Sequence, residues 1–207
     1  MQKIRNLYNR PAEQGFTLIE MAIVLVVIGL ILGMVFKGRQ LIASAKVKNA
    51  NAGYNKVIAG MNTFYDRYGF YPGDGCSGYT SGDSPTVCTD DRNGLVNTDA
   101  TDNTQAFFDL MVSTDILTEA DTESALGDAW NATGNSNATW VYVDSADSRI
   151  VCDLDRVADD GNANSGDIQA GDAVDTTWGQ TSTLYEDGDD CWGGVTGTTG
   201  VQLQVLP

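Results

Sequence analysis

The chain has 207 residues, with 28 Asp and Glu against 12 Lys and Arg and no histidine, so its formal net charge is −16. From Tyr68 onward only Arg92, Arg149 and Arg156 oppose 25 carboxylates. Nucleic-acid binding needs clustered Lys and Arg to contact phosphates, so the composition argues against a nucleic-acid partner.

Most enzyme classes are also disfavoured by composition. The sequence has no histidine, no Ser-Lys pair and no glycine-rich phosphate loop followed by lysine, so we expect no enzymatic activity. A glycosidase that uses two carboxylates stays open as an alternative, because the sequence does not give the distance between carboxylates in space.

In chain order, the first predicted element is an apolar helix that contains a single charge. Residues 16–36 form an uncharged run except for Glu20, and a short basic leader, residues 1–15, precedes them. About 20 residues at 1.5 Å each cross the hydrocarbon core of a bilayer, so we expect residues 16–36 to span a membrane. A carboxylate inside such a helix is costly, so we expect Glu20 to have a partner.

Cleavage between Gly15 and Phe16 would supply that partner. It would expose an α-amino group on Phe16, about one helical turn from Glu20. A secretory signal peptide fits less well, because in that class the cut follows the apolar region and removes it.

The string Gly15-Phe16-Thr17-Leu18-Ile19-Glu20 and the apolar helix behind it resemble the N-terminus of type IV prepilins and type II secretion pseudopilins. The resemblance implies that a prepilin peptidase cuts after Gly15 and N-methylates Phe16. It also implies that Glu20 neutralises the Phe16 amine of a neighbouring subunit during filament assembly.

The same resemblance implies partners and a location. The partners would be copies of this chain in a helical filament, other pilins, the prepilin peptidase, an inner-membrane assembly platform and, before assembly, membrane lipid. The chain would first cross the bacterial inner membrane once with its head in the periplasm, and then join an extracellular pilus or a periplasmic filament.

We expect three parts: a cleaved leader over 1–15, one long helix over 16–68 and an acidic head over 69–207. Apolar residues recur at three- and four-residue spacings between Leu41 and Tyr68, which predicts an amphipathic second half of the helix. Gly69 and the turn Pro72-Gly73-Asp74 predict its end, and this ending resembles that of a group of pilin-like proteins.

The head is predicted to be an α+β unit in which a small antiparallel sheet packs on the long helix. The expected short helices cover 104–113 and 121–126. The expected strands cover 139–143, 149–152 and 201–206.

Four cysteines in an exported head favour two disulfides, although the sequence allows three pairings. We favour neighbours in the sequence, Cys76 with Cys88 and Cys152 with Cys191, and the second loop resembles the C-terminal disulfide-bound region of pilins. A tetracysteine zinc site is the alternative, but no C-x-x-C pair is present.

One loop suggests a cation. Asp160, Asn162 and Asn164 place oxygen ligands at alternate residues, the spacing found at the start of an EF-hand calcium loop. Asp187 and Asp189 are candidates to complete a calcium site. The glycine comes one place late and a glycine holds the position of the bidentate glutamate, so an acidic solvated loop with Asx turns is the alternative. No other cofactor is expected.

The sequence is therefore interpreted as a structural subunit of a type IV pilus-like filament. A minor pseudopilin of type II secretion is the first alternative. A membrane-tethered binding module is the second, with Trp130, Trp140, Trp178 and Trp192 as a candidate surface-binding platform.

Overall fold

The computed structural model describes residues 16–96, 102–135, 137–171 and 184–206, and the expected leader lies outside them. The chain divides into two compact units, one ending at Ile42 and one beginning at Ala43. The predicted boundary at Tyr68 differs from this division, because the second half of the long helix belongs to the core of the second unit.

The first unit consists, in its described part, of the N-terminal half of α1 (Leu18–Tyr68, 51 residues). Its large apolar side chains are exposed: Phe16 is 83% exposed, Leu18 92% and Leu25 67%. This stretch is long and apolar enough to cross a membrane.

The second unit begins with the other half of α1, which buries one stripe of side chains. The buried stripe recurs at spacings of four, three and seven residues and contains Ala43, Val47, Ala50, Val57, Met61 and Phe64. Such spacings place side chains on one face of a helix, which confirms the predicted amphipathic character. Five residues that the sequence pattern placed in the stripe are exposed: Leu41, Ile42, Ala45, Ala52 and Tyr65.

The helix ends where the sequence predicts. Gly69 has a φ of +80°, and its N–H donates to the Tyr65 carbonyl at 2.7 Å. A left-handed residue after the last helical position is favourable for glycine because it has no Cβ. The polypeptide then turns through Pro72 and Gly73 into the head.

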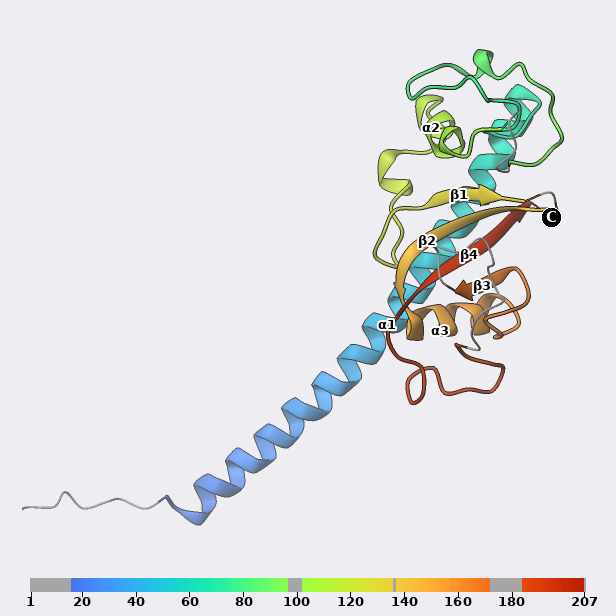
Figure 1. The fold of residues 1–207 in the computed structure, drawn as a ribbon. Coiled ribbons are helices and arrows are strands. Elements are labelled where there is room, and N and C mark those ends of the chain that lie inside the picture. The colour runs from blue at the N-terminus through green and yellow to red at the C-terminus, as the bar shows by residue number, and fades with distance from the viewer. Residues whose placement is uncertain (1–15, 97–101, 136, 172–183, 207) are drawn as a thin grey trace, which may run out of the picture. The chain divides into compact units, whose positions relative to one another are not determined.

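The head contains one four-stranded antiparallel sheet, with strand order β1-β2-β4-β3 (Figure 1). The strands are β1 (Asn131–Gly134), β2 (Thr139–Asp147), β3 (Ile168–Gly171) and β4 (Thr198–Leu206). The central pair β2 and β4 contains two of the three predicted strands, those over 139–143 and 201–206. β1 and β3 are short strands that were not predicted.

In the described part of the head the helical elements are η1 (Pro85–Val87), α2 (Gln105–Ser113), η2 (Glu119–Asp121) and α3 (Ser148–Ala158), of which η1 and η2 are short 3₁₀ turns. α2 confirms the expected helix over 104–113. The strand expected over 149–152 is wrong, because these residues lie in α3, where Asp147 accepts the Arg149 N–H and so starts a helix.

The helix expected over 121–126 is also wrong. Only Glu119–Asp121 is helical, as a 3₁₀ turn, and Glu123 then pairs with Ala129 in a short bridge. The Ser124 hydroxyl accepts the Leu126 N–H at 3.1 Å, which competes with helical bonding.

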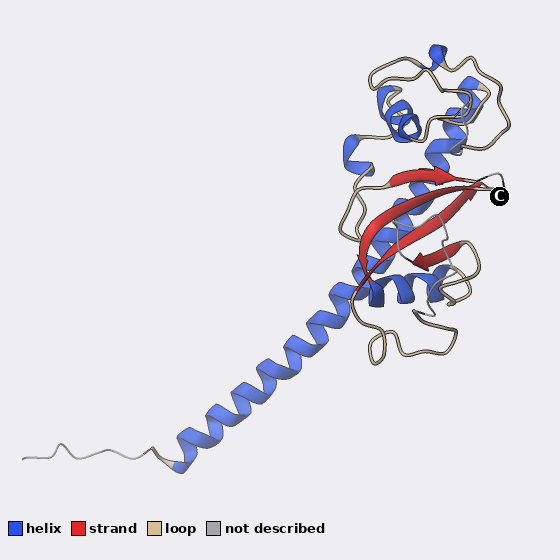
Figure 2. Cartoon of the chain, in the orientation of Figure 1, coloured by secondary structure: helices blue, strands red, loops and turns tan. Residues whose placement is uncertain are grey.

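Within the second unit, helices surround the antiparallel sheet (Figure 2). Buried side chains from α1, α2, α3 and the sheet form one hydrophobic core there. Met61, Phe64 and Phe107 from helices share this core with Val141 and Leu203 from β2 and β4. The expected α+β fold, with a helix packed on a small antiparallel sheet, is confirmed.

The four cysteines form two disulfides, Cys76–Cys88 and Cys152–Cys191, out of the three pairings that the sequence allows. All four sulfurs are therefore oxidised, and a tetracysteine zinc site does not form. The second bond ties α3 to the loop before β4.

Candidate functional site

The helix start carries a reciprocal cap built from Thr17 and Glu20. Glu20 Oε2 accepts the Thr17 backbone N–H at 3.0 Å and the Thr17 hydroxyl at 2.9 Å, while the Thr17 hydroxyl oxygen accepts the Glu20 N–H at 3.3 Å. The first N–H groups of a helix lack partners within it, so this capping box satisfies two of them. Sequence reasoning identified Glu20 but missed the role of Thr17, although the T-x-x-E spacing was visible.

The cap supplies the Glu20 carboxylate with two hydrogen-bond donors from its own chain. An ionised carboxylate can accept more than two hydrogen bonds, so Glu20 can also bind a donor from another molecule. Phe16 directly precedes Thr17 in the sequence and is 83% exposed. Gly15, the other residue of the predicted cleavage site, lies outside the described residues.

Basic residues follow the apolar segment. Lys37, Arg39, Lys46 and Lys48 are all exposed. Within the described residues the ion pairs are Lys56–Asp121 and Arg149–Asp147, so none of these four cations is paired there. They are available to lipid phosphates or to acidic groups of another molecule.

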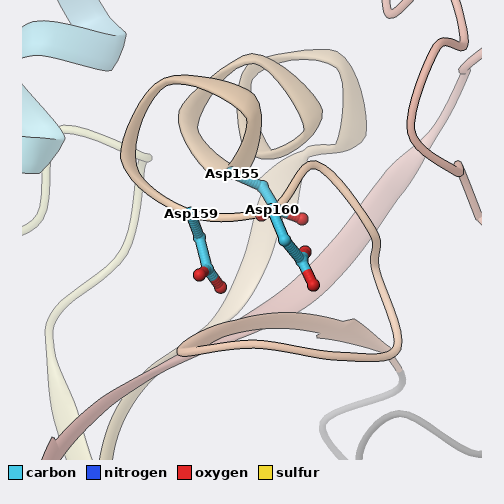
Figure 3. A group of neighbouring side chains, drawn as sticks. All are labelled: Asp155, Asp159 and Asp160. Atoms are coloured by element: carbon cyan, nitrogen blue, oxygen red, sulfur yellow. The ribbon is translucent and has the colours of Figure 1, made fainter.

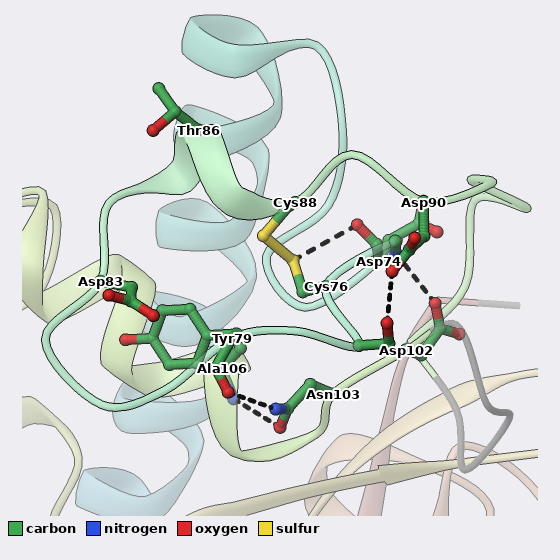
Figure 4. The surroundings of a disulfide bond; sticks show 12 residues. Asp74, Cys76, Tyr79, Asp83, Thr86, Cys88, Asp90, Asp102, Asn103 and Ala106 are labelled. Carbon is green, nitrogen blue, oxygen red and sulfur yellow. Dashed lines mark hydrogen bonds between the residues drawn. A yellow bond between two sulfur atoms is a disulfide. The ribbon is translucent and has the colours of Figure 1, made fainter.

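A buried carboxylate fixes the loop after α1 (Figure 4). Asp74 is 1% exposed, and it accepts the N–H groups of Asn93 at 3.2 Å and Gly94 at 3.1 Å. Burial raises the pKa of Asp74, while these two backbone donors act against that rise. Together with Cys76–Cys88 next to it, this carboxylate holds the loop onto the head.

A second acidic group lies where α3 ends and the loop to β3 begins (Figure 3). Asp155, Asp159 and Asp160 each present a carboxylate oxygen, and the three oxygens lie within 4.8 Å of one another. Asp155 is fully buried, Asp159 is half-buried and Asp160 is exposed, so the group opens from the core to the surface.

Burial and neighbouring charge perturb this acidic group. Burial raises the pKa of Asp155 to about 6, and the carboxylates of Asp160 and Asp159 act in the same direction. Burial and the Asp155 carboxylate likewise raise the pKa of Tyr185. The Tyr185 hydroxyl donates a hydrogen bond to the Asp155 carboxylate, which opposes the effect of burial on the pKa of Asp155.

The sequence-predicted calcium ligands are only partly brought together. Asp160 belongs to the acidic group, whereas the Asn162 side-chain oxygen accepts the Asn164 N–H. Asp189 Oδ2 accepts the Glu186 N–H at 3.0 Å, and Asp187 is exposed. Asp155 and Asp159 were not among the predicted ligands, because the strand predicted over 149–152 left no helix that continues to Ala158 and brings them near Asp160.

The tryptophans do not form a shared exposed surface within the described residues. Trp130 is 3% and Trp140 8% exposed, so both are core residues. Trp192 is 47% exposed and donates to Asp153 at 2.6 Å. Trp178 lies outside the described residues.

Comparisons with known proteins give one family model and a structural neighbour. Residues 10–36 match the prokaryotic N-terminal methylation motif. Among solved structures, the major type IV pilin PilA1 from Clostridium difficile is similar to the chain with 11% identity and a TM-score of 0.44, covering 80% of this chain and 98% of that one. No curated protein matches the sequence.

The motif covers the segment on which the resemblance to prepilins rests, including Phe16, Thr17 and Glu20. The chain therefore carries at its N-terminus the prokaryotic methylation motif that the resemblance to prepilins implies.

Proposed function

We propose that this chain is a structural subunit of a type IV pilus-like filament, cut between Gly15 and Phe16, N-methylated on Phe16 and polymerised through the N-terminal half of α1. The observation that carries the proposal is the fully exposed apolar surface of residues 18–35 with Glu20 as its only charge. Such a surface needs lipid or other apolar helices around it.

Glu20 would set the axial register between packed subunits. A carboxylate deep in an apolar environment costs roughly 2.5 kcal/mol or more, and a neighbour's Phe16 amine offsets that cost only when the two groups meet. Thr17 supplies two donors at 3.0 and 2.9 Å before assembly, which lowers the cost of holding Glu20 in lipid. The Thr17 cap therefore stabilises the Glu20 carboxylate in the unassembled subunit, and the Phe16 amine of a neighbour stabilises it in the filament.

The basic residues after the apolar segment fit both stages. Lys37, Arg39, Lys46 and Lys48 are exposed, and the head that follows is strongly acidic. In a membrane these cations would lie near lipid phosphates, and in a filament they would face the acidic heads of neighbours. This charge complementarity between basic residues and acidic heads would mainly fix the axial register of neighbouring subunits.

Replacement of Glu20 tests the proposal in the native cells. Glu20→Ala should abolish the recovery of sheared filaments, while the membrane fraction still contains the protein with both disulfides formed. Asp66→Ala is the matched control, because it removes an exposed carboxylate from the same helix outside the apolar segment, and it should leave filament recovery unchanged.

Filaments that contain the Glu20→Ala protein at the wild-type level would contradict the proposed role of Glu20 in assembly. A wild-type protein found only in the inner membrane, with none sheared off, would favour the pseudopilin or the membrane-tethered module.

A further inference from the structure

We propose that the exposed side of α3 around Trp192 binds α1 of a second copy of this chain, on the helix face that carries Lys37, Leu41 and Lys48. The head side of this contact is named the Trp192 surface and consists of Asp153, Val157, Asp190 and Trp192. The inference rests on the proposed filament role, and it names the part of the head that meets the basic residues of a neighbour.

Trp192 is fixed in place although its side chain is 47% exposed. Its indole N–H donates to Asp153 at 2.6 Å, and its backbone N–H donates to Asp190 at 3.0 Å. The Arg149 guanidinium carbon lies 5.2 Å from the ring centroid, and the adjacent Cys191 is disulfide-bonded to α3. An aromatic side chain held in this way loses little entropy on binding, which is typical of an interface anchor.

The Trp192 surface combines exposed apolar groups with carboxylates. Val157, 69% exposed, lies one turn after Asp153 on the same face of α3. The carboxylates of Asp153 and Asp190 flank the indole ring, and neither takes part in an ion pair in the described part of the chain. The charge of Arg149 is compensated by Asp147 at 2.7 Å. A segment that fits this surface therefore presents an apolar side chain between cations.

One face of α1 has this pattern. Lys37, Leu41 and Lys48 are separated by four and seven residues, so they share one face of the helix. All three are exposed, Leu41 by 65%. Lys46 differs, because Arg149 and, to a smaller extent, Lys46 lower the pKa of Asp147, so Lys46 acts on the head of its own copy. The face with Leu41 is therefore the one available to a neighbour.

The position of this face along α1 favours a second copy as its partner. Residues 37–48 directly follow the exposed apolar residues 18–35, through which the proposed filament packs. In such a filament each subunit presents this face to the heads around it. Contact between Leu41 and the indole would remove apolar area from water, and the two lysines beside two carboxylates would fix the orientation of the contact.

Carbodiimide crosslinking of filaments sheared from the native cells tests the contact, because this reagent joins only a lysine and a carboxylate that touch. Peptide mapping by mass spectrometry should find Lys37 or Lys48 joined to Asp153 or Asp190. The same crosslinks should be absent from the full-length monomer in mild detergent, since they form between copies.

The reaction has an internal control. Lys56 and Asp121 lie 2.6 Å apart within one copy, so their crosslink should form in filaments and in the monomer alike. Trp192→Ala and Leu41→Ala should each lower the yield of the crosslinks between copies roughly fivefold or more. Ile42→Ala is the matched control, because it removes an exposed apolar side chain from a different face of the same helix, and it should leave that yield unchanged.

Filaments that form the Lys56–Asp121 crosslink but none from Lys37 or Lys48 to the Trp192 surface would overturn this inference alone. Equal yields of those crosslinks in filaments and in the monomer would do the same. A wild type that gives no filaments would overturn the proposed function and this inference with it.

Discussion

The two halves of α1 share one backbone conformation but differ in what surrounds their apolar side chains. In residues 18–35, and at Leu41 and Ile42, the large apolar side chains are exposed, whereas residues 43–68 bury a stripe that ends in Phe64. The second half of the helix packs its apolar side chains against the head, while those of residues 18–35 have no such cover within the described residues. Helical structure alone therefore does not show whether an apolar face serves folding or association. The exposure of the apolar side chains distinguishes the two.

The largest expected effect on stability comes from replacing Phe64, in the buried half of the helix. Phe64 is fully buried and contacts the rings of Tyr68 and Phe70, so Phe64→Ala should lower the free energy of unfolding of the head by about 4 kcal/mol. Leu25→Ala, in the exposed half, should leave it unchanged. Guanidinium unfolding of the full chain in mild detergent, followed by tryptophan fluorescence, measures both, and equal losses in the two variants would contradict the division.

The next effect concerns the disulfide that closes the loop after α1. The bond spans 12 residues between Cys76 and Cys88, so the double variant Cys76→Ser with Cys88→Ser should cost about 3 kcal/mol through the entropy of the unfolded chain. The same unfolding experiment measures the loss. A loss below about 1 kcal/mol would show that Asp74 and its backbone bonds suffice to hold this loop.

A smaller effect is expected at the turn between helix and head. Gly73 has a φ of +101°, and a Cβ there would lie 2.7 Å from the Asn103 carbonyl oxygen. Gly73→Ala should therefore lower the free energy of unfolding by about 1–2 kcal/mol. Gly78→Ala, whose Cβ would meet nothing within 4 Å, serves as the control; the backbone argument fails if both variants behave alike.

The smallest effect depends on pH. The Lys56 side chain, with the Thr118 backbone N–H and hydroxyl, lowers the pKa of Asp121 from 3.8 to about 2. This pairing stabilises the head above pH 4, and the stabilisation is lost as the pH falls towards 2. Because Lys56 is largely exposed, the contribution should be below about 1 kcal/mol.

Asp121→Asn should remove that part of the acid dependence. Wild type and variant should differ in Tm at pH 6 and converge near pH 2. A difference that stays constant across this range would show that Asp121 does not titrate against Lys56.

The parts of the molecule that sequence predicts well are those with long or unambiguous signals. Three features are predicted from local sequence alone: the apolar run with Glu20, the helix end at Gly69 and the alternation of apolar and polar residues in β4. The short run Ile150-Val151-Cys152 fits a strand or a helix equally, and only the cap from Asp147 decides for α3.

The candidate sites follow the same rule. Glu20 was found because a lone charge in an apolar run has no other explanation. The Asp155 group was missed because its members meet only through the helical register of α3, and β1 and β3 were missed because they depend on pairing with β2 and β4.

The most direct test of the account is the intact mass and N-terminal sequence of this protein in filaments sheared from the native cells. We predict an abundant chain that begins with N-methylated Phe16 and has four hydrogens fewer than its reduced form, because two disulfides are present. A chain that still begins at Met1, or one that has lost the apolar helix, would contradict the central claim that residues 18–42 of α1 build a filament.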